Sequence, residues 1–314
     1  MDKTIKQKKG FSLIELLIVI GIIAVLGGVM LTQFSGSTES ALAASCLNNM
    51  RTLCNAVIAD ASKQGDYPSA GSFRYMEAET RKRKWGQGWI GYLGTEDSCS
   101  PVSCYHAAGD EGLDQYSAIT NGTLWRRMGG KISAYVCPAH ANMSKKGNRP
   151  TPSWSYVMNS YFGWNVGLSV DFASGKRSYG GMLSFNYSSD PQTRKRPPEK
   201  VLLFAELPYA ENGIQSPEWS TSNGTENDSV LQYAAESNER KKANRAGEGE
   251  DEAIGFNHKS GNNYSAHVAF ADGHCEKLML PREGREGDLV KLTTWLCTGQ
   301  EYTFNGARYE KVSE

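Results

Sequence analysis

Apolar residues fill one uninterrupted stretch near the start of the chain, residues 11–31, which reads FSLIELLIVIGIIAVLGGVML. As a helix rising about 1.5 Å per residue, it is long enough to cross a hydrocarbon layer about 30 Å thick. Beyond it, apolar positions follow helical spacing, and no proline occurs before Pro68. These positions are Leu42, Cys46, Met50, Leu53, Val57 and Ala61. We therefore predict one nearly continuous helix over residues 11–63, membrane-spanning at 11–31 and packed on a head thereafter.

A short basic leader, residues 1–10, stands directly before the apolar stretch. It contains four lysines and ends in Gly10, and a single carboxylate, Glu15, lies near the start of the apolar stretch. A secretory signal carries its cleavage site after the apolar run, whereas a site before the run leaves that run on the mature protein. Because positive flanks stay in the cytoplasm, we expect the residues after 31 on the periplasmic or outer side.

This arrangement resembles the N-terminal signal of type IV pilins and type II secretion pseudopilins. The residues that carry the resemblance are Lys8, Lys9, Gly10, Phe11, Ser12, Leu13, Ile14 and Glu15. It implies that a prepilin peptidase cleaves between Gly10 and Phe11 and methylates the new Phe11 terminus. It also implies that Glu15 pairs with the Phe11 amine of a neighbouring subunit and sets the register of a filament. A carboxylate inside a membrane costs on the order of a few kcal/mol and is by default functional.

The remainder of the chain, residues 64–314, predicts an α+β head in which the helix packs on an antiparallel sheet, as in pilins. Residues 200–206 (KVLLFAE) predict the strongest strand, buried on both faces, and residues 153–159 predict another. Residues 122–138 predict a short helix, a turn and a strand. The polar stretch at about 212–251 predicts a long exposed insertion.

Residues 265–280 (SAHVAFADGHCEKLML) predict a hairpin, because Asp-Gly between two β-prone runs is a strong turn signal. A two-residue loop would place His267 opposite Leu278. The segment also resembles the C-terminal motif of a large group of bacterial pilin-like proteins, a histidine followed by an FADGH-like turn. The matching residues are His258, Asn263, Phe270, Ala271, Asp272, Gly273 and His274. The gap from His258 to Asp272 is longer than that pattern, so the equivalent histidine is His258 or His267.

The composition is compatible with a packed core, because 39% of the residues are hydrophobic. The formal net charge is zero, which argues against a nucleic-acid partner. All seven cysteines follow the apolar stretch, in a compartment where disulfides form. Cys99 and Cys104 fit a local loop-closing disulfide. An odd count leaves at least one thiol free or intermolecular, and the remaining connectivity stays open.

Metal ligands do not form a recognisable sequence pattern. In the predicted hairpin, His267 and His274 share a face but lie about 13 Å apart along the strands, too far to hold one ion. We therefore interpret the hairpin histidines as polar residues rather than a zinc site. The candidates for calcium are Glu248, Glu250, Asp251 and Glu252. Their spacing is not that of an EF-hand loop, and a merely solvated acidic loop is the alternative.

The sequence contains no Gly-x-Ser-x-Gly elbow and no phosphate-binding glycine loop, so we expect neither an enzyme nor a cofactor. The leading interpretation is a minor or specialised structural subunit of a type IV pilus or type II secretion pseudopilus. Its expected partners are prepilin peptidase, copies of itself or other pilin-like subunits, and the inner-membrane assembly machinery. We expect a single-pass inner-membrane protein with a periplasmic head, which later enters a filament or reaches the cell surface. The alternative is a membrane-tethered surface protein that binds carbohydrate or protein and never polymerises.

Overall fold

The computed structural model of the protein describes the chain in several ranges. They are residues 12–64, 67–71, 73–76, 83–86, 88–91, 93–95, 98–100, 116–146, 151–159, 162, 197–207, 229–231, 254–260, 263–282 and 285–312. The insertion predicted at about 212–251 therefore lies outside the described residues, apart from 229–231. The predicted leader, residues 1–10, also lies outside the described residues, so the division into a leader, a helix and a head stays a prediction.

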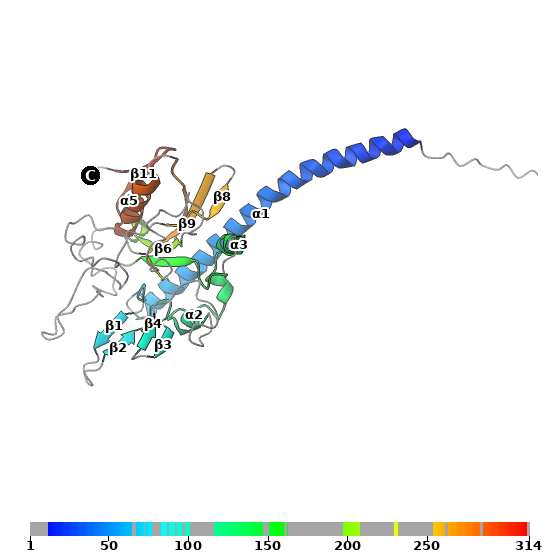
Figure 1. Ribbon diagram of the computed structural model, residues 1–314. Helices are drawn as coiled ribbons and strands as arrows, with labels where there is room; N and C mark the ends of the chain where they lie inside the picture. The colour runs from blue at the N-terminus through cyan, green and yellow to red at the C-terminus, as the bar shows by residue number, and fades with distance from the viewer. Residues whose placement is uncertain are drawn as a thin grey trace, which may run out of the picture.

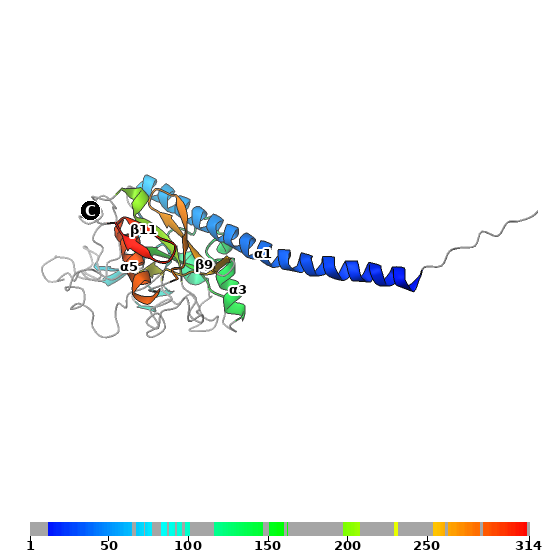
Figure 2. The ribbon, with the colours of Figure 1, turned by 90° about the horizontal axis from the view of Figure 1, so that it is seen from above.

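A single long helix, α1 (Leu13–Gln64), projects from the head as a gently curved rod (Figures 1 and 2). Its 52 residues confirm the continuous helix predicted at 11–63. The first part is apolar and exposed along its length, from Leu13 at 85% exposure to Leu26 at 56%. No helix in the described residues is both long and apolar enough to cross a membrane, so the span predicted at 11–31 is not confirmed.

The second part of α1 packs on the head through the predicted apolar stripe. Cys46, Met50, Leu53 and Val57 are fully buried, while Leu42 at the projecting end is only partly covered. The helix lies across the strands of the main sheet (Figure 1). Near the C-terminal end of α1, an ion pair between Arg127 and the buried Asp60 reinforces this apolar contact.

The main sheet has six strands, in the order β10-β9-β6-β5-β7, with β8 paired to β9. All its pairs are antiparallel except β5 with β7. Its strands are β5 (Tyr156–Asn159), β6 (Leu202–Glu206), β7 (Val230–Leu231), β8 (His258–Ser260), β9 (Asn263–Phe270) and β10 (Cys275–Met279). A long helix on a mostly antiparallel sheet confirms the predicted α+β class.

The two strands predicted from apolar runs are present at the centre of this sheet. Every residue of β6 is buried, as the run KVLLFAE predicted, and every residue of β5 is buried as well. The remaining elements surround the sheet. They are β1 (Phe73–Met76), β2 (Arg83–Gly86), β3 (Leu93–Thr95), β4 (Ser98–Ser100), α2 (Ser117–Asn121), η2 (Ile132–Ala134), α3 (Pro138–Lys146), η4 (Pro198–Lys200), α5 (Arg285–Thr298), β11 (Tyr302–Phe304) and β12 (Tyr309–Lys311).

The strand predicted within residues 122–138 is wrong. The chain there forms turns, then η2, and then α3, which begins at Pro138. Proline suits the first turn of a helix, where its missing N–H is not needed. The carbonyls that a neighbouring strand would have bonded are met by α1 instead, because Asn49 Nδ2 donates to Ser133 O and Val136 O, both at 3.0 Å.

The predicted hairpin is confirmed as β9 and β10, but its register is shifted by one residue. His267 lies opposite Lys277, whereas the two-residue loop had placed it opposite Leu278. Gly273 N donates to Phe270 O at 2.9 Å, and Gly273 has a φ of +97°. This is a three-residue loop, a turn followed by a left-handed glycine bulge, and its extra residue shifts the pairing.

Candidate metal centre

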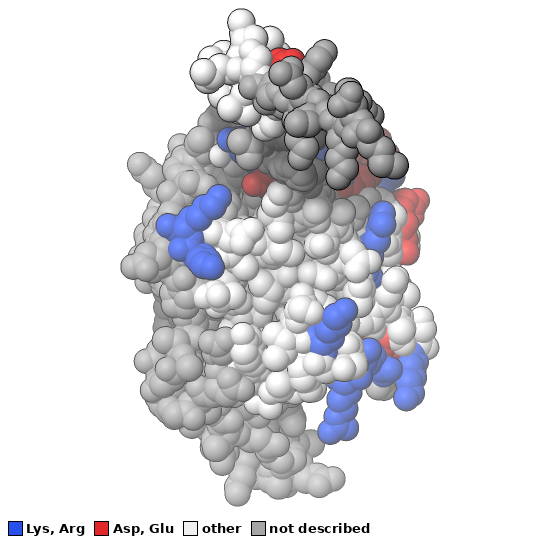
Figure 3. Space-filling view, turned by 90° about the vertical axis from the view of Figure 1, so that its right-hand side faces the viewer, with Lys and Arg blue, Asp and Glu red and all other residues white. Residues whose placement is uncertain are grey.

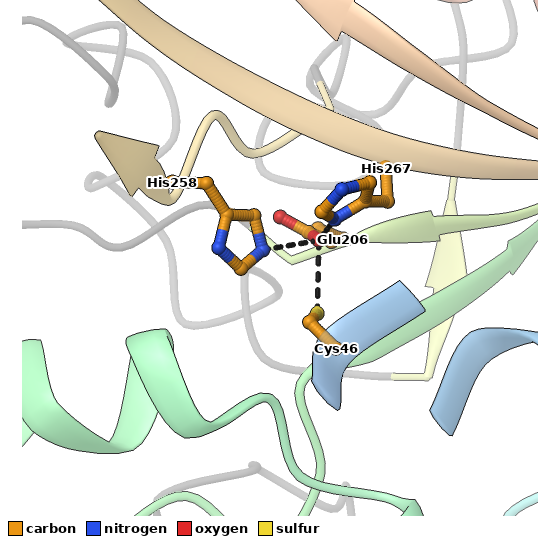
Figure 4. A group of neighbouring side chains, drawn as sticks. All are labelled: Cys46, Glu206, His258 and His267. Carbon is orange, nitrogen blue, oxygen red and sulfur yellow. Dashed lines mark hydrogen bonds and ion pairs between the residues drawn. The ribbon is translucent and has the colours of Figure 1, made fainter. Parts of the chain in front are cut away.

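A group of buried polar side chains lies between α1 and the main sheet (Figure 4). It consists of Cys46, Glu206, His258 and His267, which we call the Cys–Glu–His cluster. Each of the four residues is at most 3% exposed. Polar groups this deep in a core are expected to be fully paired or to bind an ion, so the cluster is the strongest candidate for a functional site.

Strand pairing brings three members of the cluster together. Glu206 is the last residue of β6, and the pairing of β6 with β9 continues toward His267. His258 begins β8 opposite Ser265. His267 stands two residues beyond Ser265 in β9, and therefore points to the same face of the sheet. The rings of His258 and His267 accordingly meet, with centroids 4.6 Å apart.

The fourth member comes from the helix. Cys46 belongs to the buried stripe of α1, and Figure 4 shows it approaching Glu206 from the side opposite the strands. Cys46 lies on the same face of the helix as Leu42, Met50 and Leu53, so its side chain points toward the sheet. The helix that projects from the head thus contributes one side chain to a site otherwise built from strands.

One carboxylate oxygen is the focus of the cluster. Glu206 Oε1 lies 2.8 Å from His258 Nε2, 3.0 Å from His267 Nδ1 and 3.0 Å from Cys46 Sγ. The four donor atoms that could bind a cation all lie within 4.8 Å of one another. Two imidazoles, a thiol and a carboxylate that converge in this way could together bind a metal ion.

Two further side chains border the cluster. Cys137, directly before α3, places its Sγ 3.7 Å from His258 Nε2. Tyr156 of β5 lies opposite Glu206, and its hydroxyl is 3.1 Å from Cys46 Sγ. Both residues are fully buried. The site therefore has an outer layer of a second thiol and a phenol, and no direct route to solvent through these groups.

Two polar atoms of the cluster stay unpaired within the described part of the chain, Glu206 Oε2 and His258 Nδ1. A buried carboxylate oxygen without a partner costs on the order of 1–3 kcal/mol or more. Three donors meanwhile crowd onto the other oxygen of the same carboxylate. Hydrogen bonding alone therefore does not account for the cluster, because one oxygen of Glu206 accepts from three groups while Oε2 has no partner among the described residues.

Electrostatics keeps the carboxylate and one imidazole charged when no cation is bound. Burial alone opposes ionisation of Glu206, but the charge and hydrogen bond of His258, with the hydrogen bond of His267, lower its pKa to about 2. Burial likewise opposes protonation of His258, but Glu206 and Cys137 raise its pKa to about 10. The metal-free cluster therefore contains a buried ion pair between these two side chains.

The two thiols respond in opposite directions. Burial, the hydrogen bond with Cys137 and the charge of Glu206 raise the pKa of Cys46 well above its usual value. For Cys137, burial is outweighed by hydrogen bonds from Cys46 and His258, which lower the pKa to about 7. Cys137 is thus the more readily ionised thiol of the metal-free protein.

We predict that the stability of the metal-free protein falls as pH drops below about 4.5. It also falls above about 6.5, but less steeply, because the lowered pKa of Cys137 adds stability between about pH 7 and 9 that partly offsets the loss at His258. The lowered pKa of Glu206 contributes stability that is lost as pH falls from 4.5 toward 2. The raised pKa of His258 contributes stability that is lost as pH rises from 6.5 toward 10. Urea denaturation across this range, with a chelator present, measures the effect. A midpoint that rises steadily above pH 6.5 would contradict it. The titratable side chains facing the pair are Cys46, Cys137, Tyr156 and His267.

The structure separates the histidines that sequence analysis had grouped. His258 and His267 meet in the core, whereas His274 lies at the exposed turn, where its Nδ1 is 2.6 Å from Asp272 Oδ1. Asp272 and Gly273 act as turn residues, as predicted. His267 belongs to the hairpin through β9, whereas His258 belongs to β8, and both side chains are buried against Glu206.

Sequence analysis did not identify Cys46 or Glu206 as site residues. The available signal was a charge at the end of a strand predicted to be buried on both faces, and a thiol within the buried stripe of the helix. Neither signal indicates a partner by itself. Of the other predicted sites, Glu15 lies in the first turn of α1, where its Oε2 accepts a hydrogen bond of 2.9 Å from Ser12 N.

Several predicted site residues lie outside the described residues. They are Gly10, Phe11, Cys104, Glu248, Glu250, Asp251 and Glu252. The backbone of Cys99 belongs to β4, so the proposed bridge to Cys104 stays a prediction. Among the described residues, Cys46, Cys54, Cys137, Cys275 and Cys297 form no disulfide.

Comparison with known proteins bears on the amino-terminal part of the chain. None of the curated proteins and none of the solved structures compared with the chain matches it. Residues 5–31 match the family model described as the prokaryotic N-terminal methylation motif. That match includes the Gly10–Phe11 junction and Glu15, and it implies processing by a prepilin peptidase. The chain is therefore similar, over this segment, to prepilin-type proteins.

Proposed function

We propose that the protein is a structural, non-catalytic subunit of a type IV pilus or type II secretion pseudopilus. The observation that carries the proposal is the continuity between the methylation motif at residues 5–31 and the 52-residue helix α1. The motif supplies the processing site. The helix supplies an exposed apolar surface, from Leu13 to Leu26, that is suited first to lipid and then to copies of the same helix.

Processing removes the basic leader and leaves Phe11 as the first residue of the mature chain. The subunit then waits in the inner membrane with its head on the periplasmic side. Extraction brings the apolar parts of several α1 helices together in a bundle. Interactions between these helices replace those with lipid, so the apolar surface stays away from water throughout.

The charge on the head fits this orientation. Figure 3 shows the side from which α1 projects, where Lys and Arg outnumber Asp and Glu among the described residues. The exposed Lys145 and Lys146 end α3, which lies beside the projecting helix in Figure 1. Basic side chains near a membrane surface are attracted to anionic headgroups. They would hold the head against the membrane before extraction.

The Glu15→Val variant tests the role of the helix in assembly. We expect it to be cleaved normally but to enter filaments far less than the wild type, because Glu15 is proposed to neutralise the Phe11 amine of a neighbour in a low-dielectric bundle. The measurement is the amount of subunit in sheared or purified filaments relative to the amount in membranes. The Glu39→Val variant, which removes a carboxylate further along α1, is the control.

Normal filament incorporation of Glu15→Val would overturn the proposed role of Glu15. Absence of the wild-type protein from every filament fraction, with the head exposed on the cell, would favour the surface-tethered binding protein instead. A filament fraction that contains the wild type as a rare component would identify it as a minor subunit.

A further inference from the structure

We propose that the Cys–Glu–His cluster binds a zinc ion that fastens α1 to the head. The ligands are Cys46 Sγ, Glu206 Oε1, His258 Nε2 and His267 Nδ1. This inference goes beyond the proposed filament role and does not depend on it. It assigns a structural cation to residues for which sequence analysis expected no zinc.

The donor set selects the metal. A thiol and two imidazoles are borderline-soft ligands that suit zinc, whereas calcium and magnesium take oxygen ligands almost exclusively. Four protein donors satisfy the tetrahedral shell of structural zinc, in which no position is left for water. All four residues are at most 3% exposed, which matches a closed structural site rather than an open catalytic one.

The distances are close to those of a zinc shell. Zinc bonds of about 2.0–2.3 Å place neighbouring tetrahedral donors about 3.3–3.7 Å apart. Here Glu206 Oε1 lies 2.8–3.0 Å from the three other donor atoms, and no two of the four are more than 4.8 Å apart. Moving the carboxylate oxygen outward by about 0.3–0.9 Å, and bringing the most widely separated donors about 1 Å closer by rotation of their side chains, would give the zinc shell.

Charge balance supports the same assignment. Two anionic ligands, the Cys46 thiolate and the Glu206 carboxylate, neutralise a divalent cation, while the two histidines bind as neutral imidazoles. The buried site would then carry no net charge, which avoids the large cost of an unpaired ion in a core. The unpaired Glu206 Oε2 gives the carboxylate freedom to rotate or to bind through either oxygen.

The outer layer is also suited to the ion. The Tyr156 hydroxyl, 3.1 Å from Cys46 Sγ, donates to the thiolate and orients it. Cys137 Sγ stands 3.7 Å from His258 Nε2, outside the four ligands but beside them. Hydrogen bonds from side chains that surround the ligands commonly tune the affinity of a metal site.

The ion would join segments that are distant in the chain. Cys46 and Glu206 are 160 positions apart, and they belong to the projecting helix and to the central strand. A cross-link that closes so long a loop removes much freedom from the unfolded chain. It would also transmit force between the helix and the head at Cys46, the first buried position of α1 among the residues whose burial is described.

Metal analysis of the full chain tests the inference directly. We expect close to one zinc per chain in protein purified in detergent, without an affinity tag and without chelators. Removing it with a chelator should lower the thermal midpoint, and adding zinc should restore it. The cobalt-substituted protein should show the strong visible bands of a tetrahedral ion together with a thiolate-to-cobalt charge-transfer band. Folded protein that binds neither ion stoichiometrically would overturn the proposal.

Two matched variants separate a specific site from adventitious binding. Cys46→Ser should lose the charge-transfer band and weaken zinc binding by more than the roughly 10–100-fold that follows loss of an outer-layer partner. Cys54→Ser removes another buried thiol of the same helix, one that donates to Phe270 O, and should leave both properties unchanged. Circular dichroism establishes that each variant is folded. Equal zinc binding by Cys46→Ser and the wild type would overturn the assignment.

If Cys46→Ser does not fold, the wild-type chain is tested instead, by measuring whether a chromogenic chelator removes its zinc. A specific site should retain zinc against the chelator until the protein unfolds and release it in the same transition. Release well below that transition would show that the metal is bound at the surface, and the proposal would fail.

Discussion

Replacing Glu206 with alanine is expected to destabilise the metal-free protein by about 3–5 kcal/mol. The carboxylate accepts hydrogen bonds from His258, His267 and Cys46, all buried. Alanine would leave the charge of His258 and two further donors in the core without an acceptor. Urea denaturation of the full chain in detergent with a chelator, followed by the fluorescence of the buried Trp89 and Trp154, measures the change.

A matched control for this substitution lies on β10, which is separated from β6 by β9 in the same sheet. Glu276 is also close to a histidine, with its Oε1 3.4 Å from His274 Nε2, but its side chain is 46% exposed. Exposed pairs contribute about 1 kcal/mol or less, so Glu276→Ala should be nearly neutral. Equal effects of the two substitutions would contradict the view that Glu206 is the centre of a buried network.

Replacing Gly10 with valine is expected to abolish processing almost completely. Residues 5–31 match the methylation motif, and Gly10 is the residue before the proposed cut, where the peptidase is expected to need a residue without a side chain. Intact-mass measurement should find an uncleaved leader in Gly10→Val and a methylated Phe11 terminus in the wild type. A loss of cleavage would also keep the subunit out of filaments, since Phe11 would have no free amine to pair with Glu15.

Gly21→Ala provides the comparison for this experiment. Gly21 lies in α1, and a Cβ added there meets no atom within 4 Å, so the helix should be unaffected and processing normal. Efficient cleavage of Gly10→Val, or a wild-type protein that retains Met1, would contradict the processing site. It would leave the zinc proposal intact, because that proposal rests on Cys46, Glu206, His258 and His267 alone.

Local patterns predicted the elements with strong periodicity. The helical spacing of the apolar stripe from Leu42 to Ala61 predicted α1, and the run KVLLFAE predicted β6 buried on both faces. Asp272 and Gly273 predicted the hairpin. In each case the determining interactions are close in sequence, so a short window contains them.

Prediction failed where distant segments compete with local preference. Residues 132–136 have the composition of a strand, but α1 meets their carbonyls through Asn49 and no strand forms. The loop of the hairpin took one more residue than expected, which shifted His267 to face Lys277. The C-terminal elements α5, β11 and β12 were not predicted, although Leu289, Leu292 and Leu296 of α5 have the helical spacing of buried residues.

The sequence by itself determined the amino-terminal part of this protein: a methylation motif at residues 5–31, whose apolar stretch continues into the helix α1. These features depend only on neighbouring residues and on the contrast between apolar and charged positions. Only the tertiary structure brought together the Cys–Glu–His cluster that we propose as a zinc site. Its four ligands come from one helix and three strands, and only the pairing of β6, β8 and β9 beneath α1 brings their donor atoms within 4.8 Å. Sequence separation carries no information about such convergence, because long-range contacts are set by the packing of whole elements.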